Sequence, residues 1–389
     1  MTEDPTNSGP GDGAPGTPTG DEVSARRVLT IGDHLGSIGG TESAQLAIFQ
    51  SLAERGWEVH LLYVSRGDTW AEWKSLAATT TAIGASLPTR ASPVAGTAGA
   101  LGAVIRGTRI RPSVVYVHSA GHVPVALGTA SLVRAPVVAH LHLAPPARQP
   151  QWLNAAIRRV SAVVVPSSDA ARRWTEAAAL DPSRTTVVPT GVDPDRFVPL
   201  GDARRAEVRK GIGVGTDERM ILYAGRVEHN KGAHVLIDAV DHITTPVHLV
   251  VCGDARDEIY LAGLRALIGE RNATYLGRRT DVASLMGAAD LVVVPSSVAE
   301  TQGLVIGEAL ACGTPVVAFD VGGIADSMGG FPDQLVPAGD TAQLAAAIER
   351  FAAWRRFDPG LGRRSRDWAT GHLSLDRSAQ VLEGVIARA

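Results

Sequence analysis

The chain has 389 residues, 45% hydrophobic and 20% charged, a balance typical of a folded globular protein long enough for two domains with separate cores. Its formal net charge of −3 argues against nucleic acid as a partner, because nucleic-acid binding favours a strongly basic surface. The two cysteines, Cys252 and Cys312, both fall in segments expected to be buried, so we predict neither a disulfide framework nor a zinc site.

The first 24 residues are rich in Gly, Pro, Thr and Asp and show no apolar periodicity. Such a segment cannot bury enough surface to offset the entropy lost on ordering, so residues 1–24 are expected to be a disordered tail. No apolar run approaches the length of a membrane span, and the N-terminus lacks the basic and apolar pattern of a secretory signal. We therefore expect a cytoplasmic protein.

A predicted first strand, Arg26–Gly32, leads into a glycine-rich loop that contains Gly39 and Gly40, and then into a helix that ends near Arg55. A glycine turn between a strand and a helix N-terminus is a ready anion site, because backbone N–H groups can approach an anion closely there. The loop lacks the G-x-G-x-x-G spacing of dinucleotide sites, which argues against a nicotinamide enzyme. A tight turn that binds no ligand is the alternative.

Short apolar segments then alternate with helical patterns, as in a parallel sheet wrapped by helices. The expected elements are strands at 57–64, 82–84, 114–118, 136–140 and 162–165, and helices at 94–108 and 122–133. Ligand sites in such sheets lie beyond the carboxyl ends of the strands, where His118 ends one strand and His142 follows another. A histidine there can hold a hydroxyl or phosphate, or it can be a hydrogen-bonded structural residue.

The second half of the chain repeats this alternation. A strand at Met220–Ala224 is followed by a loop with Arg226 and Lys231 and by a helix that runs to Val240. Two fixed cations beside a glycine turn suit a pyrophosphate, although an ordinary charged loop is the alternative. The remaining expected elements are strands at 248–252, 274–276, 290–295 and 315–319 and helices at 344–354 and 375–386.

The stretch from Ser296 to Ala318 holds two glutamates on either side of a predicted helix start. Glu300 lies in the loop before the helix, and Glu308 lies on the helix about two turns later. Both can face one ligand held over the helix N-terminus, which Gly303 opens and where the backbone N–H groups and the helix dipole are free to act. For either glutamate alone, a solvated surface position is the ordinary alternative.

Ser297–Ala318 resembles the signature S-x-x-E-x-F-G-L-x-x-x-E-A-x-A-C-G-x-P-V-V-A of retaining glycosyltransferases of family 4, which have the GT-B fold. Gln302 is the one departure, since the family usually has Phe there. The glycine loop, G-R-x-x-x-x-K-G at 225–232 and V-x-P-x-G-V-D at 187–193 are similar to other motifs of the family. The last motif carries Thr190 where the family has Asn. The resemblance covers about residues 28–386.

The resemblance implies an α/β fold of the GT-B type, with two Rossmann-like domains facing each other across a cleft. The N-terminal acceptor domain would span 25–197, completed by a C-terminal helix at 371–389, and the donor domain would span 198–370. The implied reaction moves a sugar from a nucleoside-diphosphate sugar, by family frequency a UDP-sugar, to an acceptor hydroxyl with retained configuration. No cofactor or metal is expected. Asp193 and Asp195 look like a metal-binding D-x-D, but Pro194 favours a turn.

The resemblance also implies a role for individual residues. Glu300 would hold a sugar hydroxyl, Glu308 the ribose, and His118 the sugar from the other domain. His142 is a poorer candidate because Leu143 replaces the usual Asp. The diphosphate and base would be bound by Arg226, Lys231 and backbone groups of Gly39, Gly40, Gly277 and Arg278, and the donor would also contact backbone groups of Thr301, Gln302, Gly303 and Leu304.

The sequence leaves the acceptor open among a small natural product, an inositol-like polyol and a growing polysaccharide. The helix expected at 147–159 carries Trp152 and three arginines, which is thin evidence for membrane contact, and a solvated face is the better explanation. Two other functions share the fold: a nucleotide-sugar 2-epimerase or hydrolase, and a catalytically silent partner subunit. The intact Glu300, Glu308, Arg226 and Lys231 argue against a silent subunit.

Overall fold

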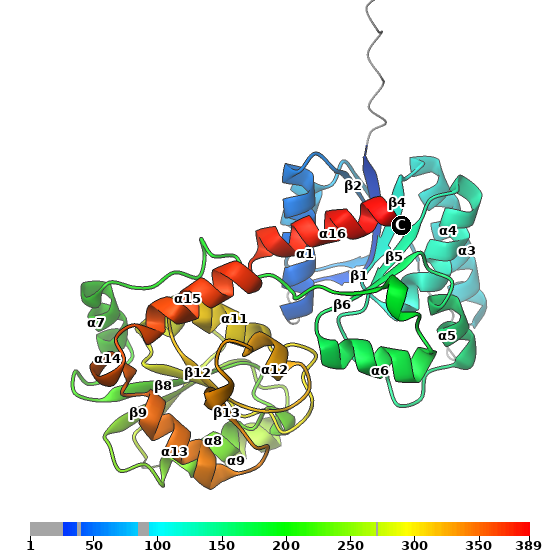
Figure 1. Cartoon of the computed structure of the whole chain (residues 1–389). Coiled ribbons are helices and arrows are strands. Elements are labelled where there is room, and N and C mark those ends of the chain that lie inside the picture. Colours follow the sequence, from blue (N-terminus) through cyan, green and yellow to red (C-terminus); the bar gives the residue numbers. More distant parts are fainter. Residues whose placement is uncertain (1–25, 37–39, 85–92, 270) are drawn as a thin grey trace, which may run out of the picture.

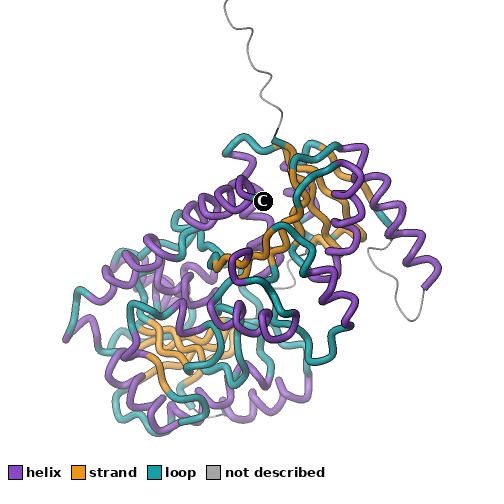
Figure 2. The backbone as a smooth tube through the Cα atoms, turned by 45° about the vertical axis from the view of Figure 1, so that its right-hand side comes forward, coloured by secondary structure: helices purple, strands orange, loops and turns teal. Residues whose placement is uncertain are grey.

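In the computed structural model, which describes residues 26–36, 40–84, 93–269 and 271–389, the chain forms two lobes, each built around one parallel β-sheet (Figure 1). The α/β architecture with two Rossmann-like sheets predicted from the sequence is confirmed. Figure 2 shows the two sheets side by side, each enclosed by helices. Within the described ranges, every helix is too short or too polar to cross a lipid bilayer.

The first sheet has the strand order β3-β2-β1-β4-β5-β6-β7, with all neighbouring strands parallel. Its central strands β4, β5 and β6 are buried along their whole length, which explains why they read as continuous apolar runs in the sequence. The strands are β1 (Arg27–Leu35), β2 (Glu58–Arg66), β3 (Thr79–Ala82), β4 (Val114–Val117), β5 (Val137–His140), β6 (Ala162–Val165) and β7 (Thr185–Val187).

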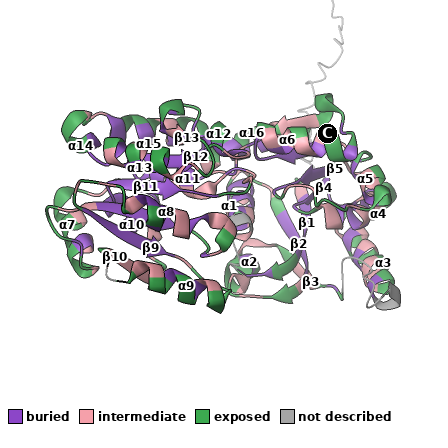
Figure 3. Cartoon of the chain, turned by 90° about the horizontal axis from the view of Figure 1, so that it is seen from below, coloured by how far each residue is buried: buried purple, intermediate pink, exposed green. Residues whose placement is uncertain are grey.

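Helices cover both faces of this sheet, and most of the buried residues lie between the sheet and these helices, whereas the exposed residues lie on the outer faces of the helices and in the loops (Figure 3). The helices are α1 (Gly40–Glu54), α2 (Trp70–Leu76), α3 (Pro93–Ile110), α4 (Val123–Val133), α5 (Gln151–Ile157) and α6 (Ser168–Ala178), with short 3-10 turns η1 (Ala120–His122) and η2 (Pro182–Arg184). The carboxyl ends of the strands meet at one edge, so His118 and His142, which follow β4 and β5, come together.

The second sheet has the order β10-β9-β8-β11-β12-β13 and is also parallel. Its strands are β8 (Arg219–Ala224), β9 (Val247–Cys252), β10 (Ala273–Gly277), β11 (Leu291–Val294), β12 (Val316–Phe319) and β13 (Leu335–Val336). The surrounding helices are α7 (Asp202–Gly211), α8 (Ala233–Val240), α9 (Glu258–Ile268), α10 (Val282–Ala288), α11 (Leu304–Ala311), α12 (Ile324–Ser327), α13 (Thr341–Phe351), α14 (Trp354–Phe357) and α15 (Leu361–His372), with 3-10 turns η3 (His229–Lys231) and η4 (Pro332–Gln334).

The last helix, α16 (Leu375–Arg388), leaves the second lobe and lies beside α1 of the first (Figure 1). Glu383 accepts hydrogen bonds from Arg55 Nη1 at 3.2 Å and from Trp57 Nε1 at 3.0 Å. The apolar face of the helix enters the core of the first lobe with Leu382, Val385 and Ile386. The first lobe is therefore completed by the far end of the chain.

Three expected elements are shifted, and the helix expected at 344–354 is α13, three residues earlier. The strand expected at 82–84 is β3, three residues earlier, and the helix expected at 147–159 is the shorter α5, which begins after Pro150 because proline fits the start of a helix but not its interior. Several elements were not predicted from the sequence; most of them are short or contain few apolar residues, and the amphipathic α9 is an exception. These are α2, α6, β7, α7, α9, α10, α12, β13, α14 and α15.

Candidate active site

A deep cleft of about 1130 Å³ separates the two lobes, and both contribute to its walls. The first lobe supplies residues that follow β1, β2 and β5, and the second supplies residues that follow β8, β9, β10 and β11. The cleft therefore lies where the carboxyl ends of two parallel sheets face each other, the usual ligand position in such sheets. The lining includes Glu42, Asp68, His142, Leu143, Arg196, Arg226, Lys231, Arg278, Glu300, Thr301, Gln302, Gly303, Leu304 and Glu308.

Lys231 and Glu300 form an ion pair on the wall of the second lobe. The Lys231 Nζ lies 2.5 Å from Glu300 Oε1, and both side chains are about four-fifths buried. The Ser296 hydroxyl donates a second hydrogen bond to the same carboxylate oxygen at 2.6 Å. The carboxylate is thus held in one position, beside a lysine ammonium group whose positive charge can bind a phosphate.

Arg226 adds a second cation to this wall. Its guanidinium, which is about half exposed, donates from Nη1 to Glu228 Oε1 at 2.8 Å. The Arg226 carbonyl accepts a hydrogen bond from the Tyr223 hydroxyl at 2.6 Å, and this contact fixes the loop after β8. Two cations are therefore presented by one short loop, and each already has a carboxylate neighbour that an anionic ligand would have to replace.

The loop that carries Glu300 runs into the N-terminus of α11, which opens toward the cleft. Gly303 caps this helix with φ of +79°, a left-handed conformation that glycine adopts readily. Glu308 lies one turn along α11, where burial raises its pKa to about 7 despite the opposing charge of Arg196. The carboxyl group of Glu308 therefore changes its charge near neutral pH.

Gln302, the residue that departs from the expected Phe, is 5% exposed and contacts the segment that links the two lobes. Its Oε1 accepts a hydrogen bond from the Thr190 N–H at 2.6 Å, and its Nε2 donates to the Thr190 carbonyl at 3.1 Å. The side-chain amide thus pairs with one backbone residue in both directions. Two of the departures from the family motifs, Gln302 and Thr190, are therefore in direct contact.

On the wall of the first lobe, the described residues place His142 at the cleft and His118 behind it. His118 is 8% exposed, and its Nδ1 lies 3.3 Å from Nε2 of His142. His140 stacks on His142 with ring centroids 3.7 Å apart, and its Nδ1 lies 2.6 Å from the Tyr116 hydroxyl. His142, ranked below His118 in the sequence analysis, is thus the histidine that faces the cleft.

Burial keeps this group of histidines uncharged. It lowers the pKa of His142 to about 4, and together with the neighbouring rings it holds the pKa values of His118 and His140 well below the ordinary value. Their ring nitrogens lie within 4.8 Å of one another, close enough for a shared metal ion. Hydrogen bonds engage Nδ1 of His140, Nδ1 of His118 and Nε2 of His142, whereas the buried Nε2 atoms of His118 and His140 have no hydrogen-bond partner among the described residues. A neutral imidazole can both donate to and accept from a hydroxyl group.

The rest of the first-lobe wall carries negative and apolar groups. Glu42 lies in the first turn of α1, and Asp68 faces Arg278 of the second lobe at 3.7 Å. Leu143, directly after His142, is 70% exposed although it lines the cleft. Among the described residues, the cations Arg226, Lys231 and Arg278 of the cleft lining therefore come from the second lobe, beside Glu300 and Glu308, and the first lobe presents Glu42 and Asp68 next to His142.

The remaining predicted residues are positioned as follows. Gly277 ends β10 and is followed by Arg278 at the cleft, while Gly40 begins α1. Gly39 lies outside the described residues. Asp193 accepts hydrogen bonds from the N–H groups of Asp195 at 2.9 Å and Arg196 at 3.3 Å, which confirms the expected turn.

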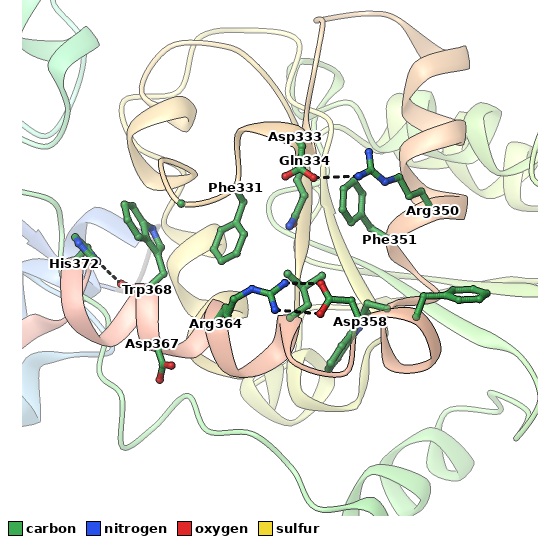
Figure 4. A pocket seen from close by; sticks show the side chains of 14 residues that line it. Phe331, Asp333, Gln334, Arg350, Phe351, Asp358, Arg364, Asp367, Trp368 and His372 are labelled. Carbon is green, nitrogen blue, oxygen red and sulfur yellow. Dashed lines mark hydrogen bonds and ion pairs between the residues drawn. The ribbon is translucent and has the colours of Figure 1, made fainter.

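A second cavity, of about 630 Å³, lies on the second lobe beside α15 and away from the cleft (Figure 4). Its charged side chains pair with each other, as Arg364 does with Asp358 at 2.5 Å. Trp368 stacks on His372 with centroids 3.9 Å apart, so that face of the indole ring is covered. Because its walls come from one lobe and both of its arginines are already paired with aspartates, we do not assign it to the reaction.

Comparisons with known proteins identify the family. Residues 38–196 match the family model Glycosyltransferase Family 4, and residues 218–353 match Glycosyl transferases group 1. The chain belongs to these glycosyltransferases. A D-inositol 3-phosphate glycosyltransferase of Xylanimonas cellulosilytica is 39% identical over 173 residues, which cover 42% of this chain and 41% of that relative. The chain thus spans about two fifths of the length of the curated relatives that it matches.

Solved structures share the whole fold. The Anabaena protein HepE in complex with UDP superposes with a TM-score of 0.81 at 22% sequence identity, covering 93% of this chain and 100% of that chain. HepE in complex with UDP-glucose gives a TM-score of 0.78 at the same identity and coverage. At this level of identity the similarity establishes the GT-B glycosyltransferase fold.

Proposed function

We propose that this protein transfers a glycosyl group from a UDP-sugar to a hydroxyl group of an acceptor, with retention of the anomeric configuration and without a bound metal. The observation that carries the proposal is the Lys231–Glu300 pair beside Arg226, at the carboxyl edge of the second sheet. This arrangement offers positive charge for a diphosphate and a fixed carboxylate for a sugar. His142 faces it from the opposite wall.

Binding of the donor would rearrange the ion pairs in the cleft. A diphosphate near Lys231 and Arg226 competes with Glu300 and Glu228 for these cations. Released from Lys231, the Glu300 carboxylate can accept a hydrogen bond from a sugar hydroxyl, while Ser296 still holds it in place. Cations fixed beside the departing diphosphate then stabilise the negative charge that develops in the transition state.

The neutral histidines suit the other side of the sugar. His142 is uncharged at neutral pH because its pKa is about 4, so it can accept from or donate to a sugar hydroxyl without adding positive charge beside an oxocarbenium-like centre. His118, at 3.3 Å, fixes the ring orientation. If the acceptor attacks the face of the sugar from which the diphosphate leaves, the leaving phosphate oxygen takes the acceptor proton. Lys231 and Arg226 then assist both the departure of the diphosphate and the transfer of this proton.

The choice of UDP rests on HepE, whose structures hold UDP and UDP-glucose. Glu308 would bind the ribose hydroxyls from α11. For the acceptor, the relatives named D-inositol 3-phosphate glycosyltransferase indicate a polyol. Glu42 on the acceptor wall would repel a phosphate on that polyol, whereas Asp68 already faces Arg278, so we propose an uncharged hydroxylated acceptor.

Thermal unfolding with UDP, GDP and ADP, followed by their sugars, tests the donor, since a ligand that binds only the folded state raises Tm. UDP is expected to give the largest rise. Glu300→Gln should then keep UDP binding, because Lys231 is freed, and lose at least tenfold in kcat, about 1.4 kcal/mol of barrier. Binding of none of the three nucleotides, or unchanged turnover in E300Q, contradicts the proposal. Conversion of UDP-GlcNAc alone to ManNAc or UDP-ManNAc would identify an epimerase instead.

A further inference from the structure

The side chain of Gln302 lies where the donor loop, the interdomain segment and the second lobe meet. Its amide makes both hydrogen bonds to Thr190, at 2.6 and 3.1 Å, and its own carbonyl accepts from the Ser327 hydroxyl at 3.0 Å. Gln302 and Thr190 are 5% and 4% exposed. Water cannot readily replace contacts buried this deeply, so the position of one residue fixes the position of the other.

Thr190 belongs to the segment through which the chain passes from the first lobe to the second. Before it, Val188 N–H donates to Val165 of β6 at 2.8 Å. After it, Val192 exchanges backbone hydrogen bonds with Leu373 and Leu375, at 2.8 and 3.0 Å, where the chain returns to the first lobe. Both chain passages between the lobes therefore run side by side at Thr190.

The packing at this crossing leaves little freedom. A Cβ atom on Gly191 would lie 2.3 Å from Cα of Leu375, so the two passages are in backbone contact. On the other side, the Gly323 N–H donates to the Glu300 carbonyl at 2.8 Å, and the Ser168 N–H donates to Asp326 at 2.5 Å across the lobes. Gln302 thus connects the crossing to the loop that holds Glu300 two residues earlier.

We propose that Gln302 is a positioning residue: its side-chain amide sets the angle between the lobes, so that Glu300 faces His142 across the cleft. The expected effect of Gln302 on turnover rests on the proposed function, whereas its expected effect on the angle between the lobes does not. An aromatic side chain at this position could not form the two-way pairing with a backbone residue. The pairing with Thr190 is therefore specific to the glutamine in this chain.

The angle between the lobes is followed through the distance between two spin labels, one on each lobe. Leu132 on α4 and Ile259 on α9 are 68% and 87% exposed and lie outside the cleft lining, so L132C and I259C provide the attachment sites. The native Cys252 and Cys312 are buried, and burial raises their pKa values to about 11 and 12, so labelling is directed to the introduced cysteines.

The test compares Gln302→Leu, which keeps the volume and removes both hydrogen bonds, with Gln302→Glu, which keeps an acceptor for Thr190 N–H and loses the donor. Gln343→Leu, at an exposed position on α13, is the matched control. We expect the interlobe distances to shift or broaden in both Gln302 variants, kcat to fall at least tenfold, and the Kd of UDP to stay within threefold of the parent value. Q302E keeps the test decisive if Q302L does not fold.

Unchanged interlobe distances in a folded Gln302 variant overturn the inference, whatever its activity. So does a fall in UDP affinity as large as the fall in kcat, because that result assigns Gln302 to the donor site alone. If the parent protein binds no nucleotide and transfers no sugar, the proposed function fails, while the distance measurement still decides the role of Gln302.

Discussion

The two walls of the cleft use different physical means. The second lobe presents charges held by short loops, with Lys231 paired to Glu300 and Arg226 paired to Glu228. The first lobe presents a stack of neutral rings, in which His118, His140 and His142 are all buried. The first arrangement suits a ligand with fixed negative charge, and the second suits hydroxyl groups. Under the proposed function, the donor would be held by charge, and the sugar and acceptor would be oriented by hydrogen bonds.

Removing a cation from the charged wall should have the largest effect. Lys231→Ala is expected to lower kcat/KM about 100-fold, roughly 2.7 kcal/mol of barrier, because Glu300 loses its partner and the diphosphate loses a positive charge. Steady-state transfer kinetics measure the change. Lys210→Ala, at an exposed position on α7, is the control and should behave as the parent protein. A loss below threefold would remove Lys231 from the donor site.

Removing a ring from the neutral wall should cost less. His142→Ala is expected to lower kcat about 20-fold, the loss of one to two hydrogen bonds made in the transition state. His118→Ala should cost only a few-fold, because His118 acts on the sugar through His142. The activity contributed by His142 should not change between pH 6 and 8, since its pKa is about 4. If His118→Ala has the larger effect, His118 rather than His142 contacts the sugar directly.

Glu308, on the charged wall, should make the free energy of unfolding depend on pH. Its pKa in the folded protein is about 7, above the ordinary value of about 4.3. The folded state therefore holds the proton more tightly, and the stability gained in this way is lost as the pH rises toward and through 7. Relative to Glu308→Gln, the parent protein should lose free energy of unfolding between pH 5 and 8, on the order of 1–3 kcal/mol. Urea unfolding across this range measures the difference, and parallel curves would contradict it.

The acceptor wall can be tested by its charge, with the smallest expected effect. Parent protein should use inositol better than D-inositol 3-phosphate, and Glu42→Lys should improve use of the phosphorylated compound about threefold through a weak, solvent-screened interaction. Glu72→Lys makes the same charge change at an exposed site on α2 outside the cleft. A parent preference for the phosphorylated acceptor would reject the proposed acceptor class.

The charged wall was readable from the sequence because its residues sit in short segments. Glu300 and Glu308 fall within one loop and helix, and Arg226 and Lys231 within another, so each pair belongs to one short motif that resembles the family's. The neutral wall is built from the ends of β4 and β5, which are 24 residues apart along the chain. The sequence brings His118 and His142 to one edge of the sheet, but only packing decides which ring reaches the cleft.

The contact between Gln302 and Thr190 lies beyond sequence reasoning for the same reason. The two residues are 112 positions apart, and each looks like an isolated departure from a family motif. The polar helices α6, α7 and α15 were missed because each contains only one or two large apolar residues. Most strands were found, since the buried ones are continuous apolar runs, whereas the short edge strands β7 and β13 were missed.

The position of α16 in the core of the first lobe has a consequence for how the protein is made. Leu382, Val385 and Ile386 fill a space beside β1 and α1, yet the ribosome adds them more than 300 residues after those elements. The hydrophobic surface that α16 covers in the N-terminal lobe therefore stays exposed while the second lobe is synthesised. The second lobe can fold independently during this time. Chaperone occupancy on nascent chains should accordingly persist until α16 has been synthesised and then fall abruptly.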